Sequence, residues 1–357
     1  MYNIHLLPAE FGDAILVEWG EGKLRYMLID GGPYYNYEQL AAGIQRVAFG
    51  LKELELLIIT HIDIDHIDGI VTLLNQSKLP FSIKEVWFNG YQQLAEVARS
   101  LGALQGEYIS TLIKKRSLPH NLHFGGGPVV INDYTNLPVV SLKGGMELLL
   151  LGPGKTALQK LEAEWLEQLD KYGKNLDIKV KLDEDHRYTP SNAWLGEELP
   201  VKELQGKKVT ADKSAANGSS IAFIGTYKNK SCLFAGDSPS DNLLQAIEPL
   251  IKMRGDERLT IDAWKLAHHC SKKSNLDKLM EKIDCKKLLV SSNGKRYKHP
   301  DPECIAKLLK NNGPDLGLYF NYKSEFTLKW QDEELKKAYQ YSTFFPLEES
   351  GITLRLV

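Results

Sequence analysis

The sequence predicts a layered α/β fold in which two β-sheets are covered by helices. Short β-prone runs alternate with segments whose apolar residues recur at helical spacing, as in sheets packed against helices. The alternation occurs in two successive halves, so each half can supply one sheet. Of the 357 residues, 43% are hydrophobic and 25% are charged, a composition typical of a globular protein.

The first half begins with two β-prone runs, residues 14–19 and 24–29, which a hairpin turn at residues 20–22 joins. The second run stops at Asp30-Gly31-Gly32-Pro33. The apolar run over residues 54–60 predicts a buried strand that leads directly into His61. Apolar periodicity predicts the other elements of this half: helices over 37–49, 92–115 and 155–172, and strands over 83–88 and 146–151.

The polar stretch over residues 173–216 has no readable period, and we interpret it as an insertion or a mobile loop. The second half then adds strands over 220–227, 231–235, 261–267 and 287–291, and helices over 241–253, 275–282 and 301–311. We expect one domain over residues 1–315 that includes the insertion. Residues 316–357 are expected to add C-terminal strands that pack on the same domain.

Charge and composition exclude several classes of protein. The 44 basic and 46 acidic side chains give a net charge of -2, which excludes a globally basic surface for nucleic acid. The four cysteines form no CxxC pair, which favours a reducing compartment without structural disulfides. No signal peptide and no apolar stretch long enough for a membrane span is evident. We therefore expect a cytoplasmic protein without membrane contact.

The segment His61-Ile-Asp-Ile-Asp-His66 carries two histidines and two aspartates within six residues, directly after the buried strand. Imidazole and carboxylate are the usual ligands of Zn²⁺ and related ions. Isoleucines fill the gaps, so the polar side chains do not simply form a solvated loop. The alternative is a polar strand-to-helix loop in which Asp65 or Asp68 caps the next helix.

The segment 61–69 resembles the HxHxDH motif of the metallo-β-lactamase superfamily, with Asp63 in place of the second histidine. Other segments are similar, in order, to motifs of the ComEC/Rec2-like branch of this superfamily. These segments are Gly12-Asp-Ala14, Leu28-Ile-Asp-Gly-Gly32, Leu233-Phe-Ala-Gly-Asp-Ser238, Leu266-Ala-His-His-Cys-Ser271 and Ser291-Ser-Asn-Gly-Lys-Arg-Tyr-Lys-His-Pro300. The resemblance runs from about residue 3 to residue 310, and it implies a four-layer αββα sandwich with a dinuclear metal site.

The resemblance also implies a ligand set: His61 and Asp63 for the first ion, Asp65, His66 and His268 for the second, and Asp237 as the bridge. His268 is preferred to His269 because it comes first after the strand over 261–267. Most of the superfamily has a further histidine just before the strand that starts near Ser220, where this chain has Ala216-Asn217-Gly218. The first ion is then one ligand short, and water, Asn217 or His186 would fill the place.

The chemistry of such a site depends on its metals. Two ions roughly 3.5–4 Å apart can hold a hydroxide and stabilise charge on the attacking and leaving oxygens. Asp65 would orient this water or accept its proton. Asp63 is a harder ligand than imidazole, so Mn²⁺ or Fe²⁺ is the alternative to Zn²⁺, which we expect first. Asp30, at the end of a strand, either orients a ligand imidazole or closes a turn on its own backbone.

Two loops near these motifs are basic: Lys272 and Lys273 in one, and residues 295–298 in the other. They would suit a phosphorylated or polyanionic substrate, and solvated loop side chains are the alternative. The resemblance places His299 at the mouth of the site as a catalytic substrate contact, with a helix-start histidine as the alternative. The other side chains expected beside the metals or the substrate are Asn217, His269, Ser271, Asn293 and Lys295.

We expect a metal-dependent hydrolase that uses a metal-bound hydroxide on a phosphodiester, either nucleic acid or a smaller phosphoester. One alternative is a hydrolase of a carbonyl ester, lactone or phosphocholine ester, which predicts an enclosed apolar pocket. The other is a non-catalytic metal-binding regulatory protein that works with a protein partner. The absence of a histidine at Ala216 is the argument for that last alternative.

Overall fold

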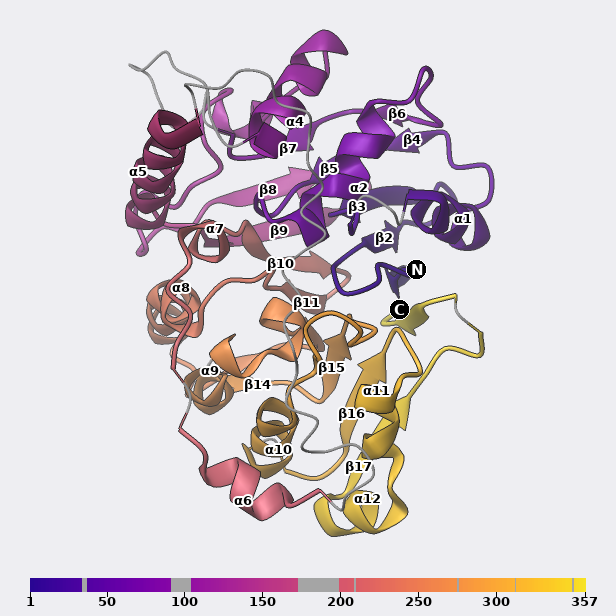
Figure 1. Ribbon diagram of the computed structural model, residues 1–357, viewed down its shortest axis with the longest axis vertical. Coiled ribbons are helices and arrows are strands. Elements are labelled where there is room, and N and C mark those ends of the chain that lie inside the picture. Colours follow the sequence, from indigo (N-terminus) through magenta and orange to yellow (C-terminus); the bar gives the residue numbers. More distant parts are fainter. Residues whose placement is uncertain are drawn as a thin grey trace.

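The computed structural model describes residues 1–33, 37–90, 104–172, 199–208, 210–274, 276–311, 313–348 and 350–357. Two large sheets, one of six strands and one of eight, pack against each other and carry helices on their outer sides (Figure 1). The predicted αββα sandwich is confirmed.

The first sheet is buried on both faces. Successive residues of a strand point to opposite sides, so Ile4 and Val17 face the core between the sheets while Leu16 and Leu28 face helices. The strand order is β18-β1-β2-β3-β5-β7. The strands are β1 (Tyr2–Leu6), β2 (Ile15–Trp19), β3 (Arg25–Ile29), β5 (Leu56–Ile58), β7 (Val86–Trp87) and β18 (Ile352–Arg355), and the helices are α1 (Tyr37–Val47), α2 (Ile64–Leu74) and α4 (Leu104–Lys115).

The second sheet has the order β17-β16-β15-β13-β11-β10-β9-β8. Neighbours from β11 through β17 pair in parallel, so their carboxyl ends share one edge. The strands are β8 (Val139–Leu142), β9 (Met146–Gly152), β10 (Ala222–Tyr227), β11 (Lys230–Phe234), β13 (Ala263–Lys265), β15 (Lys287–Val290), β16 (Leu316–Phe320) and β17 (Tyr341–Phe344). The helices beside this sheet are α5 (Lys155–Tyr172), α8 (Ser240–Arg254), α9 (Asp277–Lys282) and α10 (Pro302–Asn311) (Figure 1).

Short elements complete the layers. The apolar run over 54–60, predicted as one strand, is split: Leu54 ends one short strand and Leu56 begins β5, while the Glu55 amide donates to the Tyr26 carbonyl. The remaining short elements are β4 (Glu53–Leu54), which pairs with β6 (Ser82–Ile83), β12 (Leu259–Thr260), which pairs with β14 (Ile283–Asp284), and the 3₁₀ turns η2 (Leu122–Phe124), η3 (Ala267–Cys270), η4 (Lys272–Ser274) and η5 (Lys329–Gln331).

The C-terminal segment contributes to both sheets. β16 and β17 extend the second sheet and β18 pairs with β1 in the first. The prediction of strands alone over 316–357 was incomplete, because helices α11 (Glu325–Leu328) and α12 (Glu333–Tyr339) lie between these strands. Both helices start at side-chain caps: a capping box at Ser324, and Asp332, whose Oδ1 accepts from the Leu335 amide at 2.8 Å.

The polar stretch over 173–216 is partly helical. Its residues 173–198 lie outside the described part of the chain, as do residues 92–103 of the helix predicted over 92–115. Helix α6 (Val201–Gly206) packs on α10, where Gln205 Nε2 donates to the Ala306 carbonyl at 3.1 Å. Helix α7 (Ala215–Gly218) follows and leads into β10. Among the described helices, none is both long and apolar enough to cross a bilayer.

Candidate metal centre

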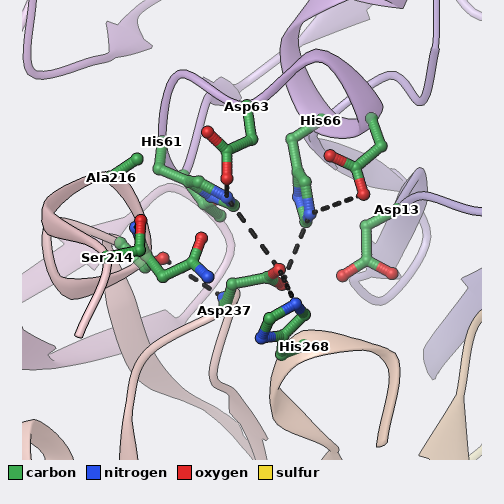
Figure 2. A network of polar contacts seen from close by, with 12 residues as sticks. Asp13, His61, Asp63, His66, Ser214, Ala216, Asp237 and His268 are labelled. Atoms are coloured by element: carbon green, nitrogen blue, oxygen red, sulfur yellow. Dashed lines mark hydrogen bonds and ion pairs between the residues drawn. The ribbon is translucent and has the colours of Figure 1, made fainter. Parts of the chain in front are cut away.

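The candidate site forms where strands of both sheets end. β5 leads into His61, β11 into Asp237 and β13 into His268 and His269. In Figure 2, imidazoles from these loops point toward the carboxylate of Asp237, which lies at the centre. Segments more than 200 residues apart in sequence thus meet at one edge of the sandwich.

Backbone contacts fix the first turn of α2. The amide of Asp13 donates to the Asp65 carbonyl at 3.2 Å, and the amide of Gly31 donates to the His66 carbonyl at 2.9 Å. Only glycine fits this approach: a Cβ on Gly12 would lie 1.8 Å from the Asp65 carbonyl oxygen, and one on Gly69 would lie 1.9 Å from the Gly31 carbonyl oxygen. These close contacts determine where Asp65 and His66 project.

None of the three aspartates near the start of α2 caps the helix. Asp63 occupies the N-cap position but makes no capping hydrogen bond with its side chain. Its Oδ2 lies 3.5 Å from Nε2 of His61 instead, and 42% of its side chain is exposed. Asp65 and Asp68 lie inside the helix. The helix-cap interpretation of Asp65 or Asp68 was therefore wrong.

His61 and His66 are oriented by one buried network. Asp30 accepts from the Thr60 amide and the Thr60 hydroxyl, both at 2.7 Å, and its Oδ2 lies 2.8 Å from His66 Nδ1. The Thr60 hydroxyl lies 2.9 Å from His61 Nδ1. Because this hydroxyl already donates to Asp30, it accepts from Nδ1–H of His61. Both Nδ1 atoms therefore carry a proton, and both Nε2 atoms face the centre.

His268 and His269 are oriented in the same way by different partners. Nδ1 of His269 lies 2.8 Å from the carbonyl oxygen of Ser291, which can only accept. Nδ1 of His268 lies 3.2 Å from Oδ2 of Asp212. Nε2 of His269 lies 3.8 Å from Oδ2 of Asp237, and Nε2 of His268 lies 3.9 Å from the same oxygen.

The four Nε2 atoms converge on Asp237, and three of them have no hydrogen-bond partner among the described residues. Nε2 of His66 is 3.3 Å from Oδ1 of Asp237, and Nε2 of His61 is 4.0 Å from Oδ2. Within the described residues, the buried Nε2 atoms of His61, His66 and His269 and Oδ1 of Asp237 make no hydrogen bond. Buried polar atoms are rarely left unpaired. A cation among these lone pairs would satisfy them, so the residues fit a metal.

Two overlapping groups of potential ligands share this centre. One comprises His61, His66 and Asp237, and in each group the ligand atoms lie within 4.8 Å of one another. The second comprises Asp65, His66 and His269. Nε2 of His269 is 3.3 Å from Oδ2 of Asp65. The geometry thus sets His269, rather than the expected His268, beside Asp65, and His268 lies on the other side of Asp237 from His66 (Figure 2).

Opposite charges hold the metal-free site together. Burial would raise the pKa of Asp237, but the imidazoles of His66, His269 and His268 hold it well below the ordinary value. Burial would lower the pKa of His66, but Asp237 and Asp30 raise it well above the ordinary value. For His269, Asp237 and Asp13 outweigh burial and raise the pKa to about 9. Protons on these imidazoles therefore balance the carboxylates, and a cation would replace them.

A buried ion pair behind His269 was not predicted as part of the site. Nζ of Lys265 donates to Oδ2 of Asp13 at 2.7 Å, and both side chains are almost completely buried. Oδ1 of Asp13 lies 3.4 Å from Nδ1 of His269. A lysine in the apolar strand before the two histidines was the available signal for this pair. Asp212 was missed as well, because the polar stretch around it has no pattern.

Four of the predicted substrate or support residues lie around the centre in other roles. Asn217 donates from Nδ2 to Oδ2 of Asp212 at 2.5 Å, and Ser271 donates to Asp301 at 3.4 Å. Asn293 bonds Glu10, and its Oδ1 accepts from the backbone amide of Lys295, whose side chain is exposed.

His299 lies at the border of the histidine cluster. Its ring stacks on that of His269 with 6.3 Å between centroids, and its centroid is 5.8 Å from that of His268. Burial, reinforced by these two imidazoles, lowers its pKa well below the ordinary value. His299 is therefore a neutral imidazole, and its role as a catalytic substrate contact stays a prediction.

The predicted basic loops are partly engaged with protein groups. Nζ of Lys272 is 3.7 Å from Oε1 of Glu303, and Nζ of Lys298 lies 4.8 Å from the ring centre of Phe326. The Arg296 guanidinium lies 4.8 Å from the ring centre of Phe11. These contacts give the loops defined positions beside His299.

The chain is similar to a known protein family in sequence and to solved proteins in structure. Residues 7–85, which include β2, β3 and the segment 61–66, match the family model described as the metallo-beta-lactamase superfamily. Solved structures similar to this chain include Zn²⁺-bound PqqB from Methylobacterium extorquens (13% identity, TM-score 0.42, 100% of both chains covered). Another is a Cronobacter sakazakii metallo-beta-lactamase with a HARLDQ motif (14% identity, TM-score 0.34, 78% of this chain and 81% of that chain covered).

No curated protein matches the sequence. The ComEC/Rec2-like branch stays a prediction. Residues 7–85, which carry the segment 61–66, are therefore similar to the metallo-β-lactamase superfamily.

Proposed function

We propose that this protein is a metal-dependent hydrolase with two divalent cations, and that its substrate contains a phosphodiester. The observation that carries the proposal is the convergence of the orphaned Nε2 atoms of His61, His66 and His269 on the buried carboxylate of Asp237. Lone pairs arranged in this way need a cation, and the fixed Nδ1–H donors make each imidazole a ready ligand.

The two groups of ligands divide around Asp237. One ion would be held by Asp65, His66 and His269, and the other by His61 and Asp63, with Asp237 between them. We propose Zn²⁺ for both, since imidazole predominates, with Mn²⁺ or Fe²⁺ as alternatives because of the carboxylates. When bound, such ions lower the pKa of a coordinated water and neutralise charge on substrate oxygens.

The residues around the metals would bind and orient the substrate. His299 is neutral and borders the centre, so it can exchange a hydrogen bond or a proton with a substrate oxygen. Lys272, Arg296 and Lys298 lie on the two loops beside it and would attract an anionic group. This positive border supports a phosphate-containing substrate, nucleic acid or a smaller phosphoester, over an uncharged carbonyl ester or lactone.

The test is a substrate panel with metal-reconstituted protein: single-stranded DNA, RNA, bis(p-nitrophenyl) phosphate, p-nitrophenylphosphorylcholine and a lactam. We expect turnover of at least one phosphodiester, and a loss of at least about 100-fold in Asp65→Asn and His66→Ala, because each removes a ligand. Asp241→Asn, an exposed change on α8, is the matched control and should keep full activity.

Three results would contradict the proposal. Turnover retained in the Asp65 and His66 variants would remove these residues from the mechanism. Hydrolysis of the lactam alone would replace the phosphodiester with a carbonyl substrate. Metal binding without turnover of any substrate would favour the regulatory alternative.

A further inference from the structure

We propose that His268 is a ligand of the first metal ion, the one held by His61 and Asp63, and that Asp212 is the residue that positions it. This inference rests on the proposed metal site and adds a fourth imidazole to it. It also gives the segment that ends at residue 216 a part in the site.

The site described above is unequal on its two sides. The group of Asp65, His66 and His269 supplies two imidazoles and a carboxylate besides Asp237. The other side supplies one imidazole, His61, and the half-exposed carboxylate of Asp63. Ala216, whose methyl group cannot bind a cation, lies on helix α7, which leads into β10, and is drawn near His61 in the view of Figure 2.

His268 approaches from the side of Asp237 that faces this gap. Its Nε2 is 3.9 Å from Oδ2 of Asp237, the same oxygen that lies 4.0 Å from Nε2 of His61. His66, by contrast, approaches the other oxygen, Oδ1, at 3.3 Å. Nε2 of His269 also lies 3.8 Å from this oxygen, but Oδ2 of Asp65 lies nearer to it, at 3.3 Å, and assigns His269 to the other ion. His268 has no such contact with Asp65 among the ion pairs of the described residues, which leaves it on the side of His61.

The backbone is strained in a way that brings both neighbouring histidines to the centre. His268, His269 and Cys270 have φ values of +50°, +53° and +62°, in the left-handed region that non-glycine residues avoid because Cβ comes close to the carbonyl oxygen. The amide of His268 donates to the Gly236 carbonyl at 3.1 Å, next to Asp237. Strain of this kind persists where the surroundings impose it, commonly at functional sites.

Asp212 is itself fixed by its own loop. Its Oδ1 accepts from the Ser214 amide at 2.9 Å, and its Oδ2 accepts from Nδ2 of Asn217 at 2.5 Å. Its amide donates to the Lys273 carbonyl at 3.0 Å, on the loop that follows His268. The carboxylate held in this way lies 3.2 Å from Nδ1 of His268 and directs Nε2 inward. The segment that precedes β10 thus contributes a carboxylate that orients an imidazole, in place of an imidazole of its own.

The test uses Co²⁺ as the probe, with stoichiometry from elemental analysis and ligand geometry from visible absorption. We expect two Co²⁺ ions per wild-type chain. His268→Ala should keep the ion held by Asp65, His66 and His269. It should bind the first ion, held by His61 and Asp63, at least about 100-fold more weakly, and added imidazole should restore binding of that ion. Asp212→Asn should weaken the same ion by about 10–100-fold and alter its spectrum.

Matched variants make the result specific. His269→Ala should weaken binding of the second ion, the one held by Asp65 and His66. A double variant of His268 and His269 should therefore lose both ions. Thermal melting of the metal-free variants checks that each is folded, and Asp262→Asn, at an aspartate bound to Lys230 and Ser231 away from the centre, should bind two ions as the wild type does.

The outcomes separate this inference from the proposed function. If the wild type binds two ions and the His268 variant binds both with unchanged affinity, the inference is overturned while the metal site stands. If His268→Ala and His269→Ala weaken the same ion, the assignment to the first ion is overturned. If the wild type binds no Co²⁺, both the inference and the proposed function fail.

Discussion

The buried pair of Lys265 and Asp13 joins the two sheets behind the metal centre, and its removal should be costly. Asp13 follows β1 in the first sheet, and Lys265 ends β13 in the second. Their side chains are 2% and 1% exposed, and Nζ lies 2.7 Å from Oδ2. Burial would raise the pKa of Asp13, but Lys265 and His269 lower it far below the ordinary value. Asp13 is therefore a carboxylate whose charge is compensated by buried cationic neighbours, with Lys265 as the first of them.

Lys265→Met should destabilise the protein by about 3–5 kcal/mol, because it removes the closest compensating charge from a buried carboxylate. With a urea m-value of about 3 kcal/mol/M, this cost lowers the unfolding midpoint by roughly 1–1.7 M. Asp13→Asn combined with Lys265→Met should be less destabilised than Lys265→Met alone, because the uncompensated charge is then absent.

The control is an exposed pair of equal length. Nζ of Lys278 lies 2.7 Å from Oδ1 of Asp241, but these side chains are 55% and 58% exposed. Lys278→Met should cost no more than about 1 kcal/mol, because solvent screens the pair. Urea unfolding of the metal-free variants, followed by circular dichroism, compares the two. Equal and small midpoint shifts for the two lysine variants would refute the reasoning that burial decides the cost.

Three further predictions concern the site and the turn that carries it. Asp30→Asn should weaken metal binding by about 10–100-fold, because the Asp30 carboxylate holds the His66 ring at Nδ1. Competition with a chelator measures the affinity. An unchanged affinity would show that the His66 ring is oriented without Asp30. The pKa of His269 is raised to about 9 in the metal-free protein, so metal binding near pH 7.5 should release protons and become tighter as the pH rises toward 9. Calorimetry in two buffers of different ionisation enthalpy measures the proton release. Identical heats of binding in the two buffers would contradict the prediction. Gly69→Ala should prevent soluble folding, since its Cβ would lie 1.9 Å from a carbonyl oxygen, whereas Gly206→Ala, with open space around it, should express as the wild type does.

Much of the fold could be predicted because its signals are local. The apolar run that contains β5 and the helical periodicity of α8 are readable within a few turns of chain. The segment 61–66 could be recognised for the same reason, since its ligands are adjacent in sequence. Helices α11 and α12 were missed although their caps at Ser324 and Asp332 are also local.

The remaining features depend on contacts between distant segments. Lys265 contacts Asp13, which lies 252 positions earlier in the sequence. Asp212 contacts His268 because the segment with α6 and α7 folds back beside the second sheet. The family resemblance implied a histidine ligand for the second ion, and order along the chain favoured His268 over His269 for it. The left-handed backbone at both histidines instead directs His269 toward Asp65, and no local pattern reports that geometry.

The central claim is that cations bind around Asp237, and anomalous diffraction from crystals grown with Zn²⁺ tests it most directly. Data collected at the zinc absorption edge should show two peaks, one on each side of the Asp237 carboxylate. We predict one peak among Asp65, His66 and His269, and the other among His61, Asp63 and His268. The absence of any anomalous peak within ligand distance of Asp237, in crystals that bind zinc elsewhere or not at all, would contradict the account.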